Sequence, residues 1–238
     1  MKKGQLLYEG KAKKLYATDE EQVIWAEYLD QATALNGARK DEIKGKGELN
    51  NQITSEIFLY LSDKGIENHF IEKLSKTEQL IKKVEVIPLE VVVRNLAAGS
   101  FSKRLGITEG TVLPEPILEF YYKEDALDDP FINEAHIAFL KIAAPEEIRL
   151  IKEAAEKVNQ ELIRLFQQIG LELVDFKIEF GRQADGTILL ADEISPDTCR
   201  LWEKESGASM DKDNYRKQLG DLVPVYREVL QRLTKISV

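Results

Sequence analysis

Apolar and polar residues alternate most strictly between residues 174 and 180, where four apolar side chains are interleaved with Asp175, Lys177 and Glu179. A period of two is typical of a β-strand with one buried face. The pair Asp185-Gly186 follows, and it predicts a two-residue hairpin turn because both central residues of such a turn adopt positive φ. The segment is therefore predicted to be a β-hairpin with a row of charged side chains on one face.

Counting outward from that turn sets the cross-strand partners of the charged residues. It places Glu179 directly opposite Asp192 and Lys177 opposite Ile194. Directly paired Cβ atoms lie about 5 Å apart, where two carboxylates destabilise a sheet unless a cation lies between them. Two interpretations stay open: Glu179 and Asp192 are ligands of a divalent cation such as Mg²⁺, or Lys177 neutralises a solvated face. A longer turn would shift the register by two and set Lys177 opposite Asp192.

The same patterns predict the other elements. Strands are expected at residues 6–9, 13–17, 22–28, 69–74, 79–84, 88–94 and 117–123. Helices are expected at residues 48–64, 101–105, 145–168 and 211–234, and Pro224 is expected to kink or interrupt the last one. Residues 30–50 hold three glycines and few large apolar side chains, which predicts a mobile surface loop. Residues 195–202 are predicted to be rich in turns.

Composition narrows the classes of function. The formal net charge of -9 argues against broad binding of nucleic acid or anionic membranes. Cys199 is the only cysteine, which excludes an internal disulfide and agrees with a reducing cytoplasm. The sequence begins without an apolar targeting segment, and no stretch holds the roughly 20 apolar residues that span a bilayer. We therefore expect a soluble, cytoplasmic protein without nucleic-acid or membrane partners.

The first candidate phosphate site is the segment around Gly10. Gly10 permits a sharp turn, and Lys11, Lys13 and Lys14 surround it with positive charge. Exposed backbone N–H groups and lysines together hold phosphate oxygens. A solvated hairpin is the alternative interpretation of the same residues.

The second candidate phosphate site follows a β-branched strand that ends at Arg94. Small residues come next and lead to Ser100, with Lys103 and Arg104 just beyond. An arginine fork with a hydroxyl and further cations suits a phosphate monoester. In the alternative interpretation Arg94 caps the end of the strand and Ser100 is the N-cap of the short helix at 101–105.

Four blocks of residues carry a resemblance to a known family. They are IPLEVVVRNLAAGS at 87–100, VDFKIEFG at 174–181, YEGKAKKLY at 8–16 and DEISPDTCRLW at 192–202. In this order and spacing the chain resembles the SAICAR synthetases of purine biosynthesis. The resemblance implies an α+β, two-lobed fold akin to ATP-grasp enzymes and protein kinases. Residues 1–86 would form a β-rich ATP-binding lobe, and residues 87–238 an α/β lobe with the nucleotide-substrate and metal site.

The resemblance also implies an activity. It is that of an ATP-dependent ligase, which joins the carboxylate of carboxyaminoimidazole ribonucleotide (CAIR) to the amine of L-aspartate through an acyl phosphate. The products would be SAICAR, ADP and phosphate, ATP and Mg²⁺ would be required, and a homodimer is expected. A kinase-like phosphotransferase acting on a small phosphorylated metabolite is the first alternative. A nucleotide-binding regulatory protein without turnover is the second.

Roles for individual residues follow from the same resemblance. The catalytic residues would be Lys13, Asp175 and Lys177. Those that bind ATP would be Gly10, Lys11, Ala12, Lys13, Lys82, Val84 and Val86. Those that bind the other substrates would be Glu90, Arg94, Gly99, Ser100, Asp175, Lys177, Ser195, Asp197 and Arg200. The metal ligands would be Glu179 and Asp192.

Overall fold

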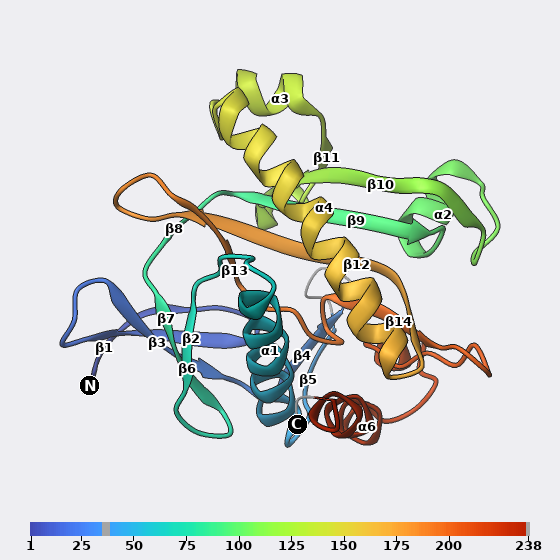
Figure 1. Cartoon of the computed structure of the whole chain (residues 1–238), viewed down its shortest axis with the longest axis horizontal. Helices are drawn as coiled ribbons and strands as arrows, with labels where there is room; N and C mark the ends of the chain where they lie inside the picture. The colour runs from blue at the N-terminus through green and yellow to red at the C-terminus, as the bar shows by residue number, and fades with distance from the viewer. Residues whose placement is uncertain (35–38, 237–238) are drawn as a thin grey trace.

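The computed structural model describes residues 1–34 and 39–236 (Figure 1). Helices combine with antiparallel sheets, which confirms the expected α+β class. The helices are α1 (Lys46–Asp63), α2 (Gly99–Leu105), α3 (Glu134–Phe139), α4 (Pro145–Gln168), α5 (Asp213–Arg216) and α6 (Leu222–Thr234), with the 3-10 turn η1 (Asp125–Leu127). Within the described ranges, each helix is too short or too polar to cross a membrane.

A five-stranded antiparallel sheet forms the N-terminal part of the chain. Its order is β1 (Lys3–Glu9), β2 (Lys13–Thr18), β3 (Val23–Tyr28), β7 (Glu78–Lys82) and β6 (Phe70–Lys73). These strands confirm the predicted ones to within a few residues at their ends. Helix α1 packs between this sheet and α6, and its predicted apolar stripe of Ile53, Ile57, Phe58 and Leu61 is fully buried.

A seven-stranded sheet forms the centre of the molecule. Its path runs β11 (Phe131–Ile132), β10 (Val112–Tyr122), β9 (Leu89–Leu96), β12 (Leu171–Arg182) and β13 (Ile188–Ala191). Strands β14 (Cys199–Glu203) and β8 (Glu85–Val86) also pair with β12. The twelve-residue strand β12 therefore touches four neighbours and sets the positions of most segments around it.

Helix α4 covers one face of the central sheet and lies diagonally across β9 and β12 in Figure 1. Its predicted bounds and buried stripe are confirmed. The stripe packs on the apolar residues of β12, and the members of this core cluster include Ile151, Ala155, Val158, Leu162, Phe176, Ile178 and Phe180. Because neighbouring residues of a strand point to opposite faces, the charged residues of β12 point away from α4.

The hairpin that joins β12 to β13 has a different turn from the predicted one. Its loop has three residues, closed by a 2.9 Å hydrogen bond from the Gln183 N–H to the Thr187 carbonyl. Gly186 has φ 87°. Glu179 consequently pairs with Ala191 and not with Asp192, so both predicted registers are wrong by one residue. The Asp185 side chain accepts from the Thr187 N–H and supports the longer loop.

Two further predictions about secondary structure are wrong. Residues 195–202, predicted to be rich in turns, contain most of β14, because four of them, Cys199 to Trp202, pair with β12. The helix predicted at 211–234 is divided into α5 and α6 by residues 217–221. Pro224 causes no kink, because it lies in the first turn of α6, where backbone N–H groups have no partner within the helix.

The segment at 30–50 is more ordered than predicted. It contains the strands β4 (Gln31–Ala34) and β5 (Arg39–Glu42), and α1 begins at Lys46. The Asp30 carboxylate accepts hydrogen bonds from the N–H groups of Gly45 and Gly47, at 3.0 and 2.9 Å. This side chain helps to close the segment, and Ala32 of β4 is buried in the main apolar core. Residues 35–38 of the predicted loop lie outside the described residues.

A buried ion pair connects the start of α1 to the loop that follows β13. The Lys46 ammonium lies 2.5 Å from the Asp197 carboxylate, and their side chains are 1% and 5% exposed. The Tyr226 hydroxyl of α6 donates to the same carboxylate at 2.6 Å. Burial alone would raise the pKa of Asp197, but Lys212 and Lys46 hold it well below its usual value. Three separate segments are therefore tied together at one anion.

Replacing Lys46 with methionine would leave the Asp197 carboxylate buried without its closest cation. We expect the free energy of unfolding in urea to fall by about 3–5 kcal/mol. Tyr226→Phe removes only a hydrogen bond to the same charge and should cost about 1.5–3 kcal/mol. Lys157→Met, at an exposed position of α4, is the control and should change little. Wild-type stability in Lys46→Met would contradict the role given to this ion pair.

Candidate active site

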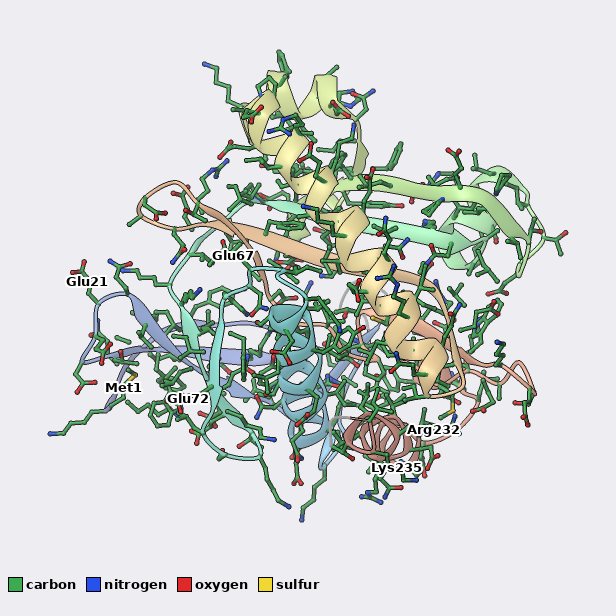
Figure 2. The ribbon with its side chains drawn as sticks, viewed as in Figure 1. Met1, Glu21, Glu67, Glu72, Arg232 and Lys235 are labelled. Carbon is green, nitrogen blue, oxygen red and sulfur yellow. The ribbon has the colours of Figure 1, made fainter. Side chains whose placement is uncertain are left out.

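A cavity of about 890 Å³ is lined by residues of the N-terminal and central sheets. In Figure 2 the labelled side chains of Glu21 and Lys235 lie toward the outside of the molecule. Other charged side chains line this cavity. Of the residues implied by the resemblance, those that line it are Gly10, Lys11, Ala12, Lys13, Lys82, Val84, Val86, Glu90, Arg94, Ser100, Asp175, Lys177, Glu179, Asp192, Asp197 and Arg200. Gly99 and Ser195 do not line it.

The loop between β1 and β2 reaches one edge of the cavity. The Gly10 N–H donates to the Lys13 carbonyl at 2.8 Å, which makes the turn tight. A Cβ at Gly10 would lie 2.9 Å from Cε1 of Tyr8, so only glycine fits without movement of that ring. The turn keeps Lys11 and Lys13 directed at the cavity, and the Lys11 ammonium lies 2.6 Å from the Asp125 carboxylate.

One end of the cavity is apolar. Leu15 of β2 packs on Ile24, Ala26 and Ile81, and all four side chains line the cavity. The backbone of residues 82–86, which links β7 to β8, passes beside them. An apolar slot next to an exposed stretch of backbone accommodates a flat aromatic ring whose edge carries hydrogen-bonding groups.

Lysines and carboxylates alternate in the middle of the cavity. The Lys13 ammonium lies 2.5 Å from the Asp192 carboxylate. Burial alone would raise the pKa of Asp192, but Lys13, Lys177 and Lys123 together hold it well below its usual value. The Lys177 ammonium in turn lies 2.9 Å from the Glu179 carboxylate. The two carboxylates therefore share the field of the same lysines, although they are not paired across the hairpin.

The backbone at Asp192 explains how this occurs. Asp192 follows the last residue of β13 and has φ 61°, a left-handed conformation that costs a residue with a side chain about 1–2 kcal/mol. Because of this turn, the Asp192 side chain does not follow the alternation of β13, and its carboxylate points toward Lys13. The strain lies at a cavity-lining residue, as is common at functional sites.

The donor set of Glu179 and Asp192 fits a hard divalent cation. Both offer only oxygen, and Mg²⁺ is commonly held by one or two carboxylates with waters and substrate phosphates completing its shell. In this structure the ammonium groups of Lys13, Lys123 and Lys177 neutralise the two carboxylates. Among the described residues there is no cluster of three or more His, Cys, Asp and Glu side chains arranged to hold a metal, so the protein alone would supply an incomplete shell.

A basic pocket occupies the other end of the cavity. The Arg94 Nη1 lies 2.7 Å from the Asp175 carboxylate, and the Arg200 Nη1 lies 2.6 Å from it. Burial raises the pKa of Asp175, and the two arginines oppose that shift. Arg94 Nη2 also donates to the Ser100 hydroxyl at 3.2 Å. Asp175 thus holds two guanidinium groups side by side next to a hydroxyl.

The structure decides against the alternative interpretation of Arg94 and Ser100. Arg94 lies inside β9, and the N-cap of α2 is Ala98, without a side-chain cap. Gly99 adopts φ 55°, and a Cβ there would lie 2.7 Å from Nη2 of Arg200. Gly99 therefore makes room for Arg200 and does not contact the cavity itself.

Two other residues assigned by resemblance have local partners. The Ser195 hydroxyl accepts from the Asp197 N–H at 3.1 Å and donates to Glu193 at 3.4 Å, so it shapes the loop after β13. Asp197 lines the cavity, but its carboxylate is engaged by Lys46 and Tyr226. Their substrate-binding roles stay predictions.

Several cavity residues are absent from the predicted set. Lys123 contacts Glu179, Asp125 contacts Lys11, and Lys212 and Arg216 line the wall near Arg200. The sequence predicts a strand at 117–123 that ends at Lys123. It does not predict that Lys123 contacts Glu179. No local pattern in the sequence marks a contact that only folding creates.

Comparisons with known proteins agree with the geometry. A sequence model described as SAICAR synthetase matches residues 6–233. The phosphoribosylaminoimidazole-succinocarboxamide synthase of Lactococcus lactis subsp. cremoris (strain SK11) is 64% identical over 235 residues, which are 99% of each chain. The protein of that name from Enterococcus faecalis (strain ATCC 700802 / V583) is 64% identical over 233 residues, which are 98% of each chain.

Solved structures give the same result. The crystal structure of phosphoribosylaminoimidazole-succinocarboxamide synthase from Ehrlichia chaffeensis is 46% identical, with a TM-score of 0.94 over 97% of this chain and 98% of that one. A SAICAR synthetase in complex with ADP is 47% identical, with a TM-score of 0.93 over 96% of this chain and 97% of that one. The chain therefore belongs to the SAICAR synthetase family.

Proposed function

We propose that the protein is an ATP-dependent ligase that joins the carboxylate of CAIR to the amine of L-aspartate and releases SAICAR, ADP and phosphate. One observation carries the proposal. A single cavity contains the Gly10 turn with its lysines, the carboxylates of Glu179 and Asp192, and the pocket formed by Arg94 and Ser100. The chain also has full-length relatives that are named as this synthase. A relative solved with ADP supports the use of ATP.

Each part of the cavity suits one part of the chemistry. The apolar slot and the backbone at Lys82, Val84 and Val86 would hold adenine, and the Gly10 turn would lie over the phosphates. Arg94 and Ser100 would bind the ribose phosphate of CAIR. The charges of Lys13 and Lys177 would then flank the point where the two substrates meet.

The reaction needs two steps because the oxygen of a carboxylate is a poor leaving group. A CAIR carboxylate oxygen attacks the γ-phosphorus, and ADP leaves. The amine of aspartate then attacks the acyl carbon, loses a proton, and phosphate leaves. Lys13 and Lys177 would stabilise charge on the transferring phosphoryl group. Mg²⁺ held by Glu179 and Asp192 would neutralise phosphate charge that otherwise repels the incoming carboxylate.

A kinase-like phosphotransferase is less well supported. In that reading Asp175 would accept a proton from a substrate hydroxyl. Its carboxylate already pairs with Arg94 and Arg200 inside a buried network. We propose instead that Asp175 orients the two arginines and that Glu90 holds Lys177, whose ammonium lies 2.8 Å away.

The proposal extends to the organisation of the protein. Residues 1–86 would form the ATP-binding lobe and residues 87–238 the lobe for CAIR and the metal. The lone cysteine, Cys199, is buried and unpaired as a thiol, which supports a cytoplasmic location. We also propose a homodimer, for which the support is the family resemblance alone.

Steady-state assays with CAIR, ATP, Mg²⁺ and L-aspartate, each omitted in turn, test the ligase. We expect sustained ADP release only when all four are present. In the absence of aspartate, ADP should form far more slowly, because the acyl phosphate has no amine to attack it. A stable phosphorylated product formed without aspartate would instead support the phosphotransferase.

Replacing Asp192 with asparagine keeps the size of the side chain and removes its charge. We expect circular dichroism to show a retained fold and turnover to fall at least ~100-fold, because the site loses a charged oxygen ligand. Asp185→Asn, in the exposed turn of the same hairpin, is the matched control and should keep wild-type activity. Undiminished turnover in Asp192→Asn would refute the metal assignment.

A further inference from the structure

Two buried carboxylates lie behind the basic pocket and take no part in the reaction described above. Glu119 of β10 and Asp213 of α5 do not line the cavity, and their side chains are 5% and 2% exposed. A buried carboxylate needs partners that offset its loss of water. Each of the two has an arginine of the cavity wall as a partner: Arg94 pairs with Glu119, and Arg200 pairs with Asp213.

The register of the central sheet brings these charges together. Arg94 of β9 is paired with Asp175 of β12, and Asp175 is paired with Arg200 of β14. Directly paired side chains point to the same face of a sheet. On the other side of β9, Glu119 lies two residues from the position opposite Arg94, so it shares that face. The result is a row of alternating charge, in the order Glu119, Arg94, Asp175, Arg200 and Asp213.

Each arginine in this row is fixed at two of its three nitrogen atoms. Arg94 donates from Nε to Glu119 and from Nη1 to Asp175, both at 2.7 Å. Arg200 donates from Nε to Asp213 at 3.0 Å and from Nη1 to Asp175 at 2.6 Å. Because a guanidinium group is planar and rigid, two fixed nitrogens set the direction of the third, Nη2.

The Nη2 atoms are the donors that this row leaves available to a ligand. Nη2 of Arg94 donates to two hydroxyls of the cavity wall, that of Ser100 at 3.2 Å and that of Tyr121 at 3.3 Å. Within residues 1–34 and 39–236, Nη2 of Arg200 donates to no protein group, and it lies beside Gly99, where a Cβ would be 2.7 Å away. A phosphate oxygen is a stronger acceptor than a hydroxyl.

The two outer carboxylates are themselves held in place. Glu119 accepts a second hydrogen bond from Nη2 of Arg104, and Asp213 accepts one from Nη1 of Arg216 at 2.9 Å. Burial alone would raise the pKa of Asp213, but Arg200 and Arg216 hold it well below its usual value. Each end of the row is therefore a fixed anchor for the arginine next to it.

We propose that Glu119 and Asp213 are positioning residues, which hold Arg94 and Arg200 by Nε so that both guanidinium groups present Nη2 to the phosphate of the nucleotide substrate. The inference rests on the proposed function, because it takes this pocket to bind CAIR. An arginine contact with phosphate depends on direction as well as charge, so an arginine that is free to rotate binds phosphate less well. The two carboxylates act on the ligand only through the arginines.

The test measures the dissociation constant of CAIR by calorimetry on the full chain, without ATP or aspartate, so it does not require turnover. Glu119→Gln and Asp213→Asn keep the size of each side chain and remove its charge. We expect each change to weaken CAIR binding about tenfold, because the arginine is no longer held in one orientation. The dissociation constant of ADP should stay unchanged, since the proposed nucleotide site lies at the other end of the cavity.

Steady-state kinetics separate positioning from a purely structural role. In both variants the KM for CAIR should rise in proportion to its dissociation constant, while kcat changes far less and the KM for ATP stays the same. A carboxylate that only stabilises the fold would lower the unfolding temperature without this selective loss. Glu115→Gln, at an exposed position of β10, is the matched control and should bind CAIR as the wild type does.

A variant that keeps the charge remains informative if the neutral ones fail to fold. Glu119→Asp retains the carboxylate but shortens the side chain by one carbon, so it should still weaken CAIR binding. Wild-type affinity for CAIR in Glu119→Asp would show that charge alone matters and would overturn the positioning role of Glu119. If only one of Glu119→Gln and Asp213→Asn loses affinity, the role of the other residue is overturned.

Arg94→Met distinguishes a failure of this inference from a failure of the proposed function. If Arg94→Met loses affinity for CAIR while Glu119→Gln and Asp213→Asn retain it, only the positioning role is overturned. If Arg94→Met itself binds CAIR as tightly as the wild type does, the assignment of this pocket to CAIR fails, and the roles of Glu119 and Asp213 fail with it.

Discussion

The alternation of strand β12 is the constraint on which the rest of the structure depends. Its apolar residues, including Phe176 and Ile178, pack under α4, which forces Asp175, Lys177 and Glu179 onto the opposite face. A shift of one residue in this strand would place three charges in the apolar core under α4 and turn the apolar side chains toward the cavity. The same apolar contacts that stabilise the central sheet therefore also set the order of charges along the cavity.

Charge balance is the second consequence of this arrangement. The Lys177 side chain is partly buried, which alone would lower its pKa, but Glu179, Glu90 and Asp192 raise the pKa well above its usual value. Neither the lysines nor the carboxylates would be tolerated here alone, because a buried charge needs a partner. A ligand that brings phosphates and a divalent cation together adds charges of both signs. It can therefore exchange partners with the lysines and carboxylates without leaving a net charge uncompensated.

The sequence predicted what depends on short-range patterns. The strands, the long helix at 145–168 and the charged face of residues 174–180 all follow from periodicity, and the structure contains them. The hairpin register was missed because Asp185-Gly186 also fits a three-residue loop with glycine in the left-handed position. β14 was missed because its pairing with β12 is a tertiary contact. The order at 30–50 was missed because one side chain, that of Asp30, closes the segment.

The resemblance supplied most of the candidate site residues. It did not supply the side chains that they contact. The resemblance assigned Gly99 and Ser195 to substrate binding. In the structure Gly99 leaves space for Arg200 and the Ser195 hydroxyl binds its own loop, and their roles in substrate binding stay predictions. The resemblance gave no reason to consider His69. A buried histidine is ordinarily a core residue, and only the fold shows that His69 lines the cavity.

These cases share a physical cause. The cavity combines charged residues on one face of β12 with residues where regular structure ends, such as the turn after β1 and the left-handed residue after β13. Inside a strand, side chains alternate and backbone groups are paired, so β12 contributes a row of charges along one face. At a strand end the backbone is free to turn, and Asp192 uses that freedom. The left-handed turn costs about 1–2 kcal/mol, and the ion pair with Lys13 of β2 holds the carboxylate that the turn presents.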